Sequence, residues 1–354
     1  MDLVGFMGHW LKLCRLSNGP TVVSGAIAGT VITGLIVGAK ADDMIASSCI
    51  SSITLVMVYV FGMILNDVLD RKIDAQERPG RPIPSGNIPV AMAVVATVIL
   101  VLLSLGIALS IGMQALVAVV VLISIVVLYD WLHAGWAGSA LLMGLCRGMV
   151  YIVSAAFLVE YIDADIEPIR QDLVFATVGV AGILAAYVTM FTVLASREVV
   201  DAEERLACGN CDQLVGETAG GRCPECGRPL DPAGLVMPGA ARRRLVLMSM
   251  GMPVLLLLGA LFIGPALGQD QELSLNPWSI IMGVLTIVLL FGTCIAAAAR
   301  YGSGRRPEAV MGWIAVISIY DAYLLALLTV PLGWVAALGC FALSRLAHSK
   351  IAGS

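Results

Sequence analysis

The stretch NDVLDRKID at residues 66–74, followed by RPGRPIPSG at residues 78–86, concentrates charge at the end of an almost uninterrupted apolar run. It holds three carboxylates and four cations, although only 13% of the chain's residues are charged. On a helix, Asp67, Asp70 and Asp74 fall within about 60° of one another, so we expect their carboxylates to face one way. They would repel one another unless a cation joined them. Hard oxygen donors favour Mg²⁺, which keeps few protein ligands and prefers to share itself with substrate phosphates.

Cationic side chains follow these carboxylates. Arginine offers a planar fork that binds phosphate oxygens in pairs, and lysine offers a compact charge. We expect three of them to meet the phosphate charge that the metal leaves over: Lys72, Arg78 and Arg81. A helix end solvated by charges is the alternative, and it explains the charge but not three carboxylates on one face beside Asn66.

The spacing of these residues resembles the first aspartate-rich motif of the UbiA-type intramembrane prenyltransferases. The resemblance implies a Mg²⁺-dependent enzyme with nine membrane spans. It would move an isoprenyl group from a polyprenyl diphosphate to a membrane-soluble acceptor, aromatic or lipid-like. The three aspartates would be catalytic and would hold Mg²⁺ together with the asparagine. The matching positions are Asn66-Asp67-x-x-Asp70-x-x-x-Asp74 and Arg78-x-x-Arg81-Pro82-x-x-x-Gly86.

Hydrophobic residues make up 59% of the 354 residues, and the mean hydropathy is +0.94. Apolar runs of about twenty residues recur, which predicts an all-α, polytopic bundle of membrane helices and excludes a soluble core of this size. The last two runs are separated by only a few residues, so they form either a tight re-entrant pair or one broken helix, and the count is nine or ten. We expect the bilayer as a partner and no nucleic acid. The candidate spans are 20–39, 44–65, 88–109, 112–130, 137–159, 173–195, 245–267, 277–299, 309–329 and 332–347.

The distribution of Lys and Arg predicts the orientation. With the N-terminus inside, 18 of the 21 lie in inner segments, and the outer loops carry only Lys40 and Arg170. We therefore expect the N-terminus on the cytoplasmic side of a bacterial cytoplasmic membrane. No short apolar segment with a cleavage site stands out at the start, so the first span is expected to act as its own membrane signal. Residues 3–14 place apolar side chains on one helical face, which predicts an interfacial helix.

Arg147 lies well inside the fifth span, where a charge is expensive unless it faces a cavity, a carboxylate or an anionic ligand. We expect it to face the pocket and contact diphosphate or acceptor. The alternative for Arg147 is a structural ion pair. The intramembrane Asp321 could be its partner in that pair, or it could itself face the cavity. Tyr151, one turn after Arg147, is expected on the same face. The resemblance adds Asn18, at the mouth of the first span, and Tyr129, at the end of the fourth, as binding residues.

A second acidic cluster ends the sixth span, where the resembled family carries its second aspartate-rich motif. The usual Asp-x-x-x-Asp is not present. Glu198 and Asp201 stand three residues apart on one helical face and offer oxygen ligands for a second Mg²⁺, with Arg197 near the diphosphate. The departure leaves open which carboxylates bind that metal and whether the activity is ordinary.

A cysteine-rich insert follows this cluster. Two Cys-x-x-Cys pairs, the second in a Cys-Pro-Glu-Cys-Gly turn, predict a small zinc ribbon on the cytoplasmic side. Four thiolates leave no open position, so the Zn²⁺ would be structural and would supply folding energy to the insert. Disulfides are the alternative, but the reducing side of the membrane disfavours them. The insert could cap the site or dock a protein partner. The expected ligands are Cys208, Cys211, Cys223 and Cys226.

The sequence thus predicts three parts: spans one to six in residues 1–195, a cytoplasmic loop with the second cluster and the ribbon in 196–240, and the remaining spans in 241–354. Two rival functions stay open. A phosphatidyl-type transferase would also use aspartates and Mg²⁺, but its Asp-Gly-x-x-Ala-Arg signature is absent. A non-catalytic protein of the same fold, binding lipid or a partner through its ribbon, is favoured by the altered second motif.

Overall fold

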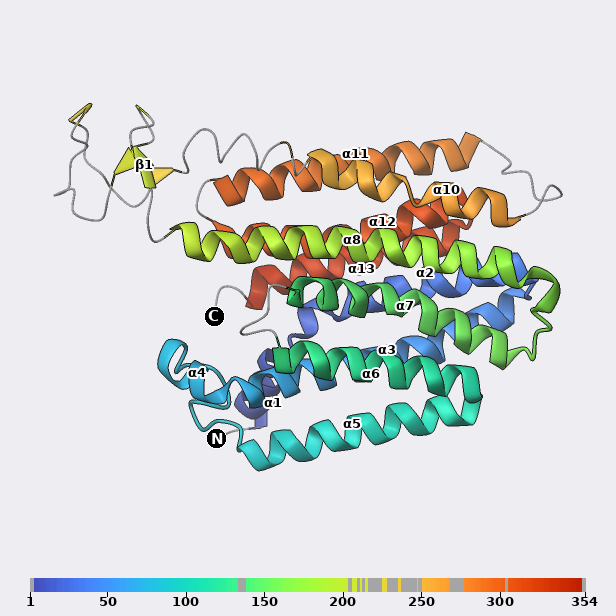
Figure 1. Ribbon diagram of the computed structural model, residues 1–354, viewed down its shortest axis with the longest axis horizontal. Helices are drawn as coiled ribbons and strands as arrows, with labels where there is room; N and C mark the ends of the chain where they lie inside the picture. Colours follow the sequence, from blue (N-terminus) through green and yellow to red (C-terminus); the bar gives the residue numbers. More distant parts are fainter. Residues whose placement is uncertain are drawn as a thin grey trace.

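Long helices run side by side along the longest axis of the molecule (Figure 1). The structure is a computed structural model. It describes residues 3–132, 138–202, 206–208, 211, 214–215, 225–227, 235–236, 247, 250–267, 277–302 and 305–351.

The described residues form the following helices and strands. In chain order they are α1 (Leu3–Leu13), η1 (Leu16–Asn18), α2 (Gly19–Val37), α3 (Ala41–Leu69), α4 (Arg71–Glu77), α5 (Val90–Ile111), α6 (Met113–Leu132), α7 (Ser139–Tyr161), η2 (Glu167–Ile169), α8 (Arg170–Ala202), β1 (Leu206–Cys208), β2 (Leu214–Val215), β3 (Leu235–Val236), α10 (Ala260–Ile263), η4 (Gly264–Leu267), α11 (Pro277–Gly302), α12 (Arg306–Leu327) and α13 (Pro331–Ile351).

The predicted all-α membrane bundle is confirmed. Within the described residues, eight helices are long and apolar enough to cross a membrane. The other two predicted spans correspond to a shorter apolar helix at Met250–Ala266 and to α13. The last two predicted runs form two separate helices, α12 and α13, which are joined by three residues and pack against each other. They are therefore a tight pair and not one broken helix.

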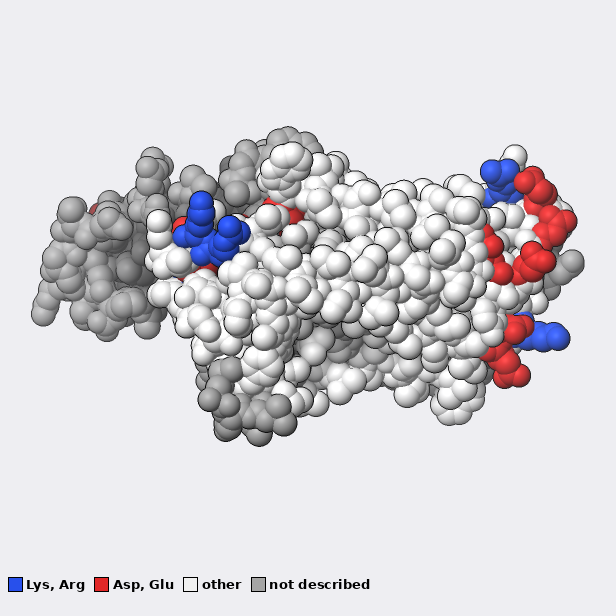
Figure 2. Space-filling model, turned by 90° about the horizontal axis from the view of Figure 1, so that it is seen from below, with Lys and Arg blue, Asp and Glu red and all other residues white. Residues whose placement is uncertain are grey.

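On the face shown in Figure 2, the charged side chains of the described residues gather at the two ends of the bundle, and the surface between them carries none. One end carries α1, α4 and the small sheet, and the opposite end carries the loop between α7 and α8 (Figure 1). The uncharged surface between the ends is the one that a bilayer covers, because a charged side chain in hydrocarbon is costly. The chain is thus a multi-span integral membrane protein whose charged motifs lie at the membrane faces.

Close packing of α7 against its neighbours sets the direction of its side chains. A Cβ added at Gly148 would lie 2.7 Å from the carbonyl oxygen of Ala181 on α8, so only glycine allows this approach. Three residues further along the same helix, the backbone of Tyr151 lies against Gly29 of α2. Small residues allow such backbone contact between membrane helices. The side chain of Arg147 contacts Thr21 of α2 and Tyr59 of α3.

A small apolar cluster fixes the segments around the end of α3. Leu13 and Ile88 are fully buried, and Ile83 is 6% exposed. They pack with Ile64 and Val68 of α3, so α1 and the loop after α4 are held against the end of that helix. The predicted interfacial helix at residues 3–14 therefore also has a packing role, and it brings the start of α2 close to the first aspartate-rich motif.

Short strands are present in the insert, and they form one antiparallel sheet in the order β2-β1-β3. Leu206 pairs with Val215, and Ala207 pairs with Val236. The insert is thus a separate small element on the charged end of the bundle that carries α4 (Figure 1).

Candidate functional site

The first aspartate-rich motif lies where α3 gives way to α4. Asp70 stands between the two helices, and backbone hydrogen bonds of 2.9 Å continue across it from Asp70 N to Asn66 O and from Asp74 N to Asp70 O. Asp67 and Asp74 are buried, with 4% and 3% exposure, whereas Asp70 is half-buried. The helical period therefore buries two of the three carboxylates at one end of the bundle.

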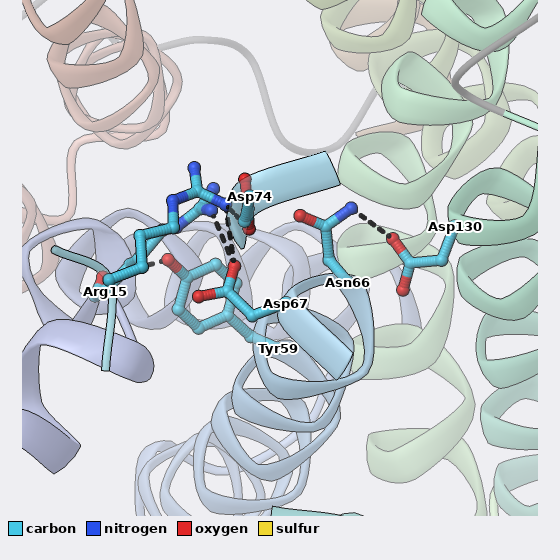
Figure 3. A network of polar contacts seen from close by, with 7 residues as sticks. Arg15, Tyr59, Asn66, Asp67, Asp74 and Asp130 are labelled. Atoms are coloured by element: carbon cyan, nitrogen blue, oxygen red, sulfur yellow. Dashed lines mark hydrogen bonds and ion pairs between the residues drawn. The ribbon is translucent and has the colours of Figure 1, made fainter. Parts of the chain in front are cut away.

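Two guanidinium groups hold the buried carboxylates. Arg81 Nη1 donates to Asp74 Oδ2 at 2.5 Å and lies 3.4 Å from Asp67 Oδ1. Arg15 Nη2 donates to the same Asp67 oxygen at 3.0 Å (Figure 3). The sequence predicts that a cation joins these carboxylates, and arginine fills that role here. The loop of residues 78–89 folds back over α4 and supplies one of the two charges.

Arg15 is a site residue that the sequence reasoning missed. It adopts a left-handed conformation with φ 44°, uncommon for a residue other than glycine. The hydroxyl of Tyr59 donates to its carbonyl oxygen at 2.9 Å. A lone arginine between an interfacial helix and the first span was the available signal, but nothing in the sequence paired it with Asp67.

An apolar cavity begins beside the motif. It lies between α2, α3, α6 and α7 and has a volume of about 80 Å³. Asn66 connects the motif to the cavity, since its Nδ2 donates to Oδ1 of Asp130, a buried cavity residue, at 3.3 Å (Figure 3). Aliphatic side chains dominate its walls, and its polar groups come from four residues: Tyr59, Tyr129, Asp130 and Arg147.

Arg147 lines this cavity, as the sequence predicts. Its Nη1 donates to Thr21 Oγ1 at 3.1 Å, and its guanidinium carbon lies 5.6 Å from the centre of the Tyr59 ring. The expected alternative, an ion pair with Asp321, is absent from the contacts of the described residues. Tyr129 also lines the cavity. These two residues therefore bring a cation and a phenol to one apolar space.

Two other predicted residues lie elsewhere. Tyr151 is 1% exposed and, away from the cavity lining, donates its hydroxyl to Asp321, which also accepts a bond of 2.5 Å from Ser24. Tyr151 therefore does not share the face of Arg147. It lies between α2 and α12. Asn18 is also outside the cavity lining, and its Oδ1 lies 2.7 Å from Nε2 of His348.

Lys72 and Arg78 are exposed beside the motif, and neither forms an ion pair within the described part of the chain. They are placed to meet a ligand from solution but do not stabilise the carboxylates.

The remaining predicted residues lie at or beyond the edge of the described part. Arg197, Glu198 and Asp201 fall on the last turns of α8, but their side chains lie outside the described residues. Of the four expected zinc ligands, Cys223 and the side chain of Cys208 lie outside them too. Among the residues that are described, no group of three or more His, Cys, Asp or Glu side chains forms a metal site. The second cluster and the zinc ribbon stay predictions.

Comparisons with known proteins give a family and several relatives. A model of the UbiA prenyltransferase family matches residues 27–207. A digeranylgeranylglyceryl phosphate synthase of Methanococcus maripaludis strain C6 is 38% identical over 96 residues, which cover 27% of this chain and 33% of that protein. One from Methanopyrus kandleri is 28% identical over 200 residues, covering 51% of this chain and 70% of that protein. This chain thus spans only about a third of the length of the first relatives that it matches.

A solved structure gives the same fold. An apo UbiA homolog from Aeropyrum pernix K1 aligns with a TM-score of 0.57 at 16% identity, covering 88% of this chain and 98% of that one. The relatives named above are archaeal, and the expected bacterial origin and the orientation stay predictions. The family model spans just over half of the chain and includes the whole first motif, Arg147 and the cavity helices α3, α6 and α7. The chain belongs to the UbiA prenyltransferase family.

Proposed function

We propose that this protein is a Mg²⁺-dependent intramembrane prenyltransferase. It would move an isoprenyl group from a polyprenyl diphosphate to a membrane-soluble acceptor. One observation carries the proposal: the cluster of Asp67, Asp74, Arg15 and Arg81 is linked through Asn66 and its hydrogen bond to Asp130 to an apolar cavity. A prenyl diphosphate has this same division, with a charged head and an apolar tail.

The donor set of the motif suits Mg²⁺. Mg²⁺ takes oxygen ligands and needs only one or two carboxylates when substrate phosphates complete its coordination. Asp67 and Asp74 are buried carboxylates, Asp70 is half-buried, and Asn66 adds an amide oxygen. These residues would hold the metal, with a second ion at Glu198 and Asp201. Bound Mg²⁺ would neutralise the charge that develops on the leaving diphosphate.

The arginines would bind the diphosphate. Arg15 and Arg81 lie at the carboxylates, and Arg147 lines the cavity. Guanidinium groups bind phosphate oxygens in pairs of hydrogen bonds. Lys72, Arg78 and Arg197 would add charge at the entrance. Tyr129 would orient the ligand at the boundary between the polar and apolar parts.

The cavity would protect the reacting carbon. The C1–O bond of the allylic diphosphate breaks, and the electron pair leaves with the diphosphate. A nucleophilic carbon or oxygen of the acceptor then bonds to C1 and loses a proton. The aliphatic walls, among them Val22, Leu55 and Val126, exclude water that would otherwise capture the cation.

A lipid-like acceptor is favoured over an aromatic one. The relatives described above carry the name digeranylgeranylglyceryl phosphate synthase, which describes a glyceryl phosphate bearing two prenyl groups. We therefore propose a prenylated glyceryl phosphate as the acceptor class, with the site and the zinc ribbon on the cytoplasmic face. The ribbon would hold one structural Zn²⁺ at Cys208, Cys211, Cys223 and Cys226, and it offers a surface for a protein partner.

Transfer of a radiolabelled prenyl group tests the proposal. Membranes containing the protein are supplied with labelled geranylgeranyl diphosphate and Mg²⁺, and with either geranylgeranylglyceryl phosphate or a hydroxybenzoate. We expect labelled product with the glyceryl phosphate. Labelled product with the hydroxybenzoate but not with the glyceryl phosphate would show that the acceptor is aromatic and not lipid-like. No transfer to either acceptor would favour the non-catalytic, lipid-binding alternative suggested by the altered second motif.

A further inference from the structure

His348 of α13 touches the segment that carries Arg15. The imidazole is 7% exposed, and its Nε2 lies 2.7 Å from Oδ1 of Asn18. The other ring nitrogen, Nδ1, is buried and has no hydrogen-bond partner among the described residues. We assign the proton to Nε2, because a proton on Nδ1 would be a buried donor without an acceptor. His348 thus donates to Asn18 across 330 residues of sequence.

Asn18 is connected to both arginines of the candidate site. Its backbone N–H donates to the carbonyl oxygen of Arg15 at 3.1 Å. Its own carbonyl oxygen accepts from the hydroxyl of Thr21 at 2.7 Å. With its proton directed to Asn18, Thr21 Oγ1 can only accept from Arg147, as the 3.1 Å contact requires. One residue therefore connects to the arginine at the carboxylates and to the arginine in the cavity.

The Arg15 turn needs such support. Its left-handed backbone, with φ 44°, is unfavourable for a residue with a Cβ. Tyr59 and the N–H of Asn18 both donate to its carbonyl oxygen, and α13 packs against η1 and α2. The side chain of Asn18 forms no cap on the following helix, so its contact with His348 is a tertiary one.

We propose that His348 is a positioning residue for diphosphate binding. Through Asn18 it holds residues 15–21 so that Arg15 faces Asp67 and Thr21 orients Arg147. The last helix of the bundle thereby supports the arginines near the start of α2 and in α7. The inference rests on the proposed function, because it assigns these arginines to the diphosphate.

Substitutions at His348 separate positioning from packing. His348→Gln keeps an N–H donor near the position of Nε2, whereas His348→Leu fills a similar volume without a donor. Loss of one such hydrogen bond should raise the Kd for the ligand by a factor of about three to ten. We expect His348→Leu to weaken binding of Mg²⁺-pyrophosphate to the purified full-length protein by about that factor and His348→Gln to restore it, measured by titration calorimetry.

A matched control lies one turn away on the same helix. Ser344 is fully buried, and its hydroxyl has no hydrogen-bond partner among the described residues. Ser344→Ala therefore measures the effect of changing a buried side chain of α13 without removing a hydrogen bond. It should bind pyrophosphate as the wild type does. Asn18→Ala should match His348→Leu, and the double variant should be no worse than either one, because both remove the same contact.

Hydrogen exchange gives a readout that does not need a ligand. The backbone amides of residues 16–19 and 21 should exchange faster in His348→Leu but not in His348→Gln or Ser344→Ala. Wild-type protein that fails to bind Mg²⁺-pyrophosphate would refute the proposed function, and the role of His348 with it. Wild-type binding together with equal binding and equal exchange in His348→Leu would overturn the role of His348 alone.

Discussion

Arg81 joins two buried carboxylates, so replacing it with glutamine should make the stability of the protein depend on Mg²⁺. Arg81→Gln removes the ion pair to Asp74 and one of the two pairs to Asp67. Arg15 still pairs with Asp67, but no other cation contacts Asp74 among the described residues. Two carboxylates that are almost completely buried would then carry more negative charge than the arginines neutralise.

The cost follows from the burial of the pair. Removing one partner of a buried ion pair costs about 3–5 kcal/mol. The side chain of Arg81 is 22% exposed, so water screens part of the interaction. We expect a loss of about 2–3 kcal/mol in metal-free protein. At about 2–4 °C per kcal/mol this lowers the melting temperature by roughly 5–10 °C.

Thermal unfolding in detergent, with EDTA or with Mg²⁺, measures this effect. Mg²⁺ should recover part of the loss, because binding at ten times its Kd adds about 1.4 kcal/mol. Arg78→Gln is the matched control, since Arg78 is exposed three residues away and forms no ion pair among the described residues. An Arg81→Gln protein that melts as the wild type does in EDTA would refute the reasoning.

Other variants probe the rest of the site. Asp70→Asn should abolish prenyl transfer with little change in melting temperature; normal transfer would remove Asp70 from the motif. Asp67→Asn should abolish transfer and also lower the melting temperature, since it weakens two guanidinium contacts; equal melting would contradict the ion pairs. Arg147→Gln should raise the KM for prenyl diphosphate about tenfold or more, and an unchanged KM would leave it structural. Cys223→Ser should release one zinc per chain by elemental analysis, with the bundle still inserted; zinc-free wild type would exclude the ribbon.

The sequence predicts well what depends on local pattern. Apolar runs of membrane length became helices because a lipid environment leaves few other ways to satisfy the backbone. The i, i+7 relation of Asp67 and Asp74 buried both on one side, as the helical period requires. Arg81 was expected at the site from its spacing, although its contacts with the carboxylates were not.

Contacts between segments that are distant in the chain could not be predicted from sequence patterns. Arg15 meets Asp67 across 52 residues because an apolar cluster holds α1 against the end of α3. Tyr151 was assigned to the face of Arg147 from helical spacing. A one-turn offset leaves about 40° between them, and with Gly29 packed behind it Tyr151 turns towards α12. Residue spacing along one helix does not show which other helix packs against each of its faces.

The central claim is that the cluster at the end of α3 binds the diphosphate through a metal. An experimental structure with Mn²⁺ and a non-hydrolysable prenyl diphosphate tests it, because the anomalous signal of Mn²⁺ locates the metal. We predict metal at Asp67 and Asp70, diphosphate near Arg15 and Arg81, and the prenyl chain in the cavity beside Arg147. Metal and diphosphate bound away from this cluster would contradict the claim. A first metal at the cluster, with Glu198 and Asp201 turned to lipid or bulk water, would contradict the second metal only.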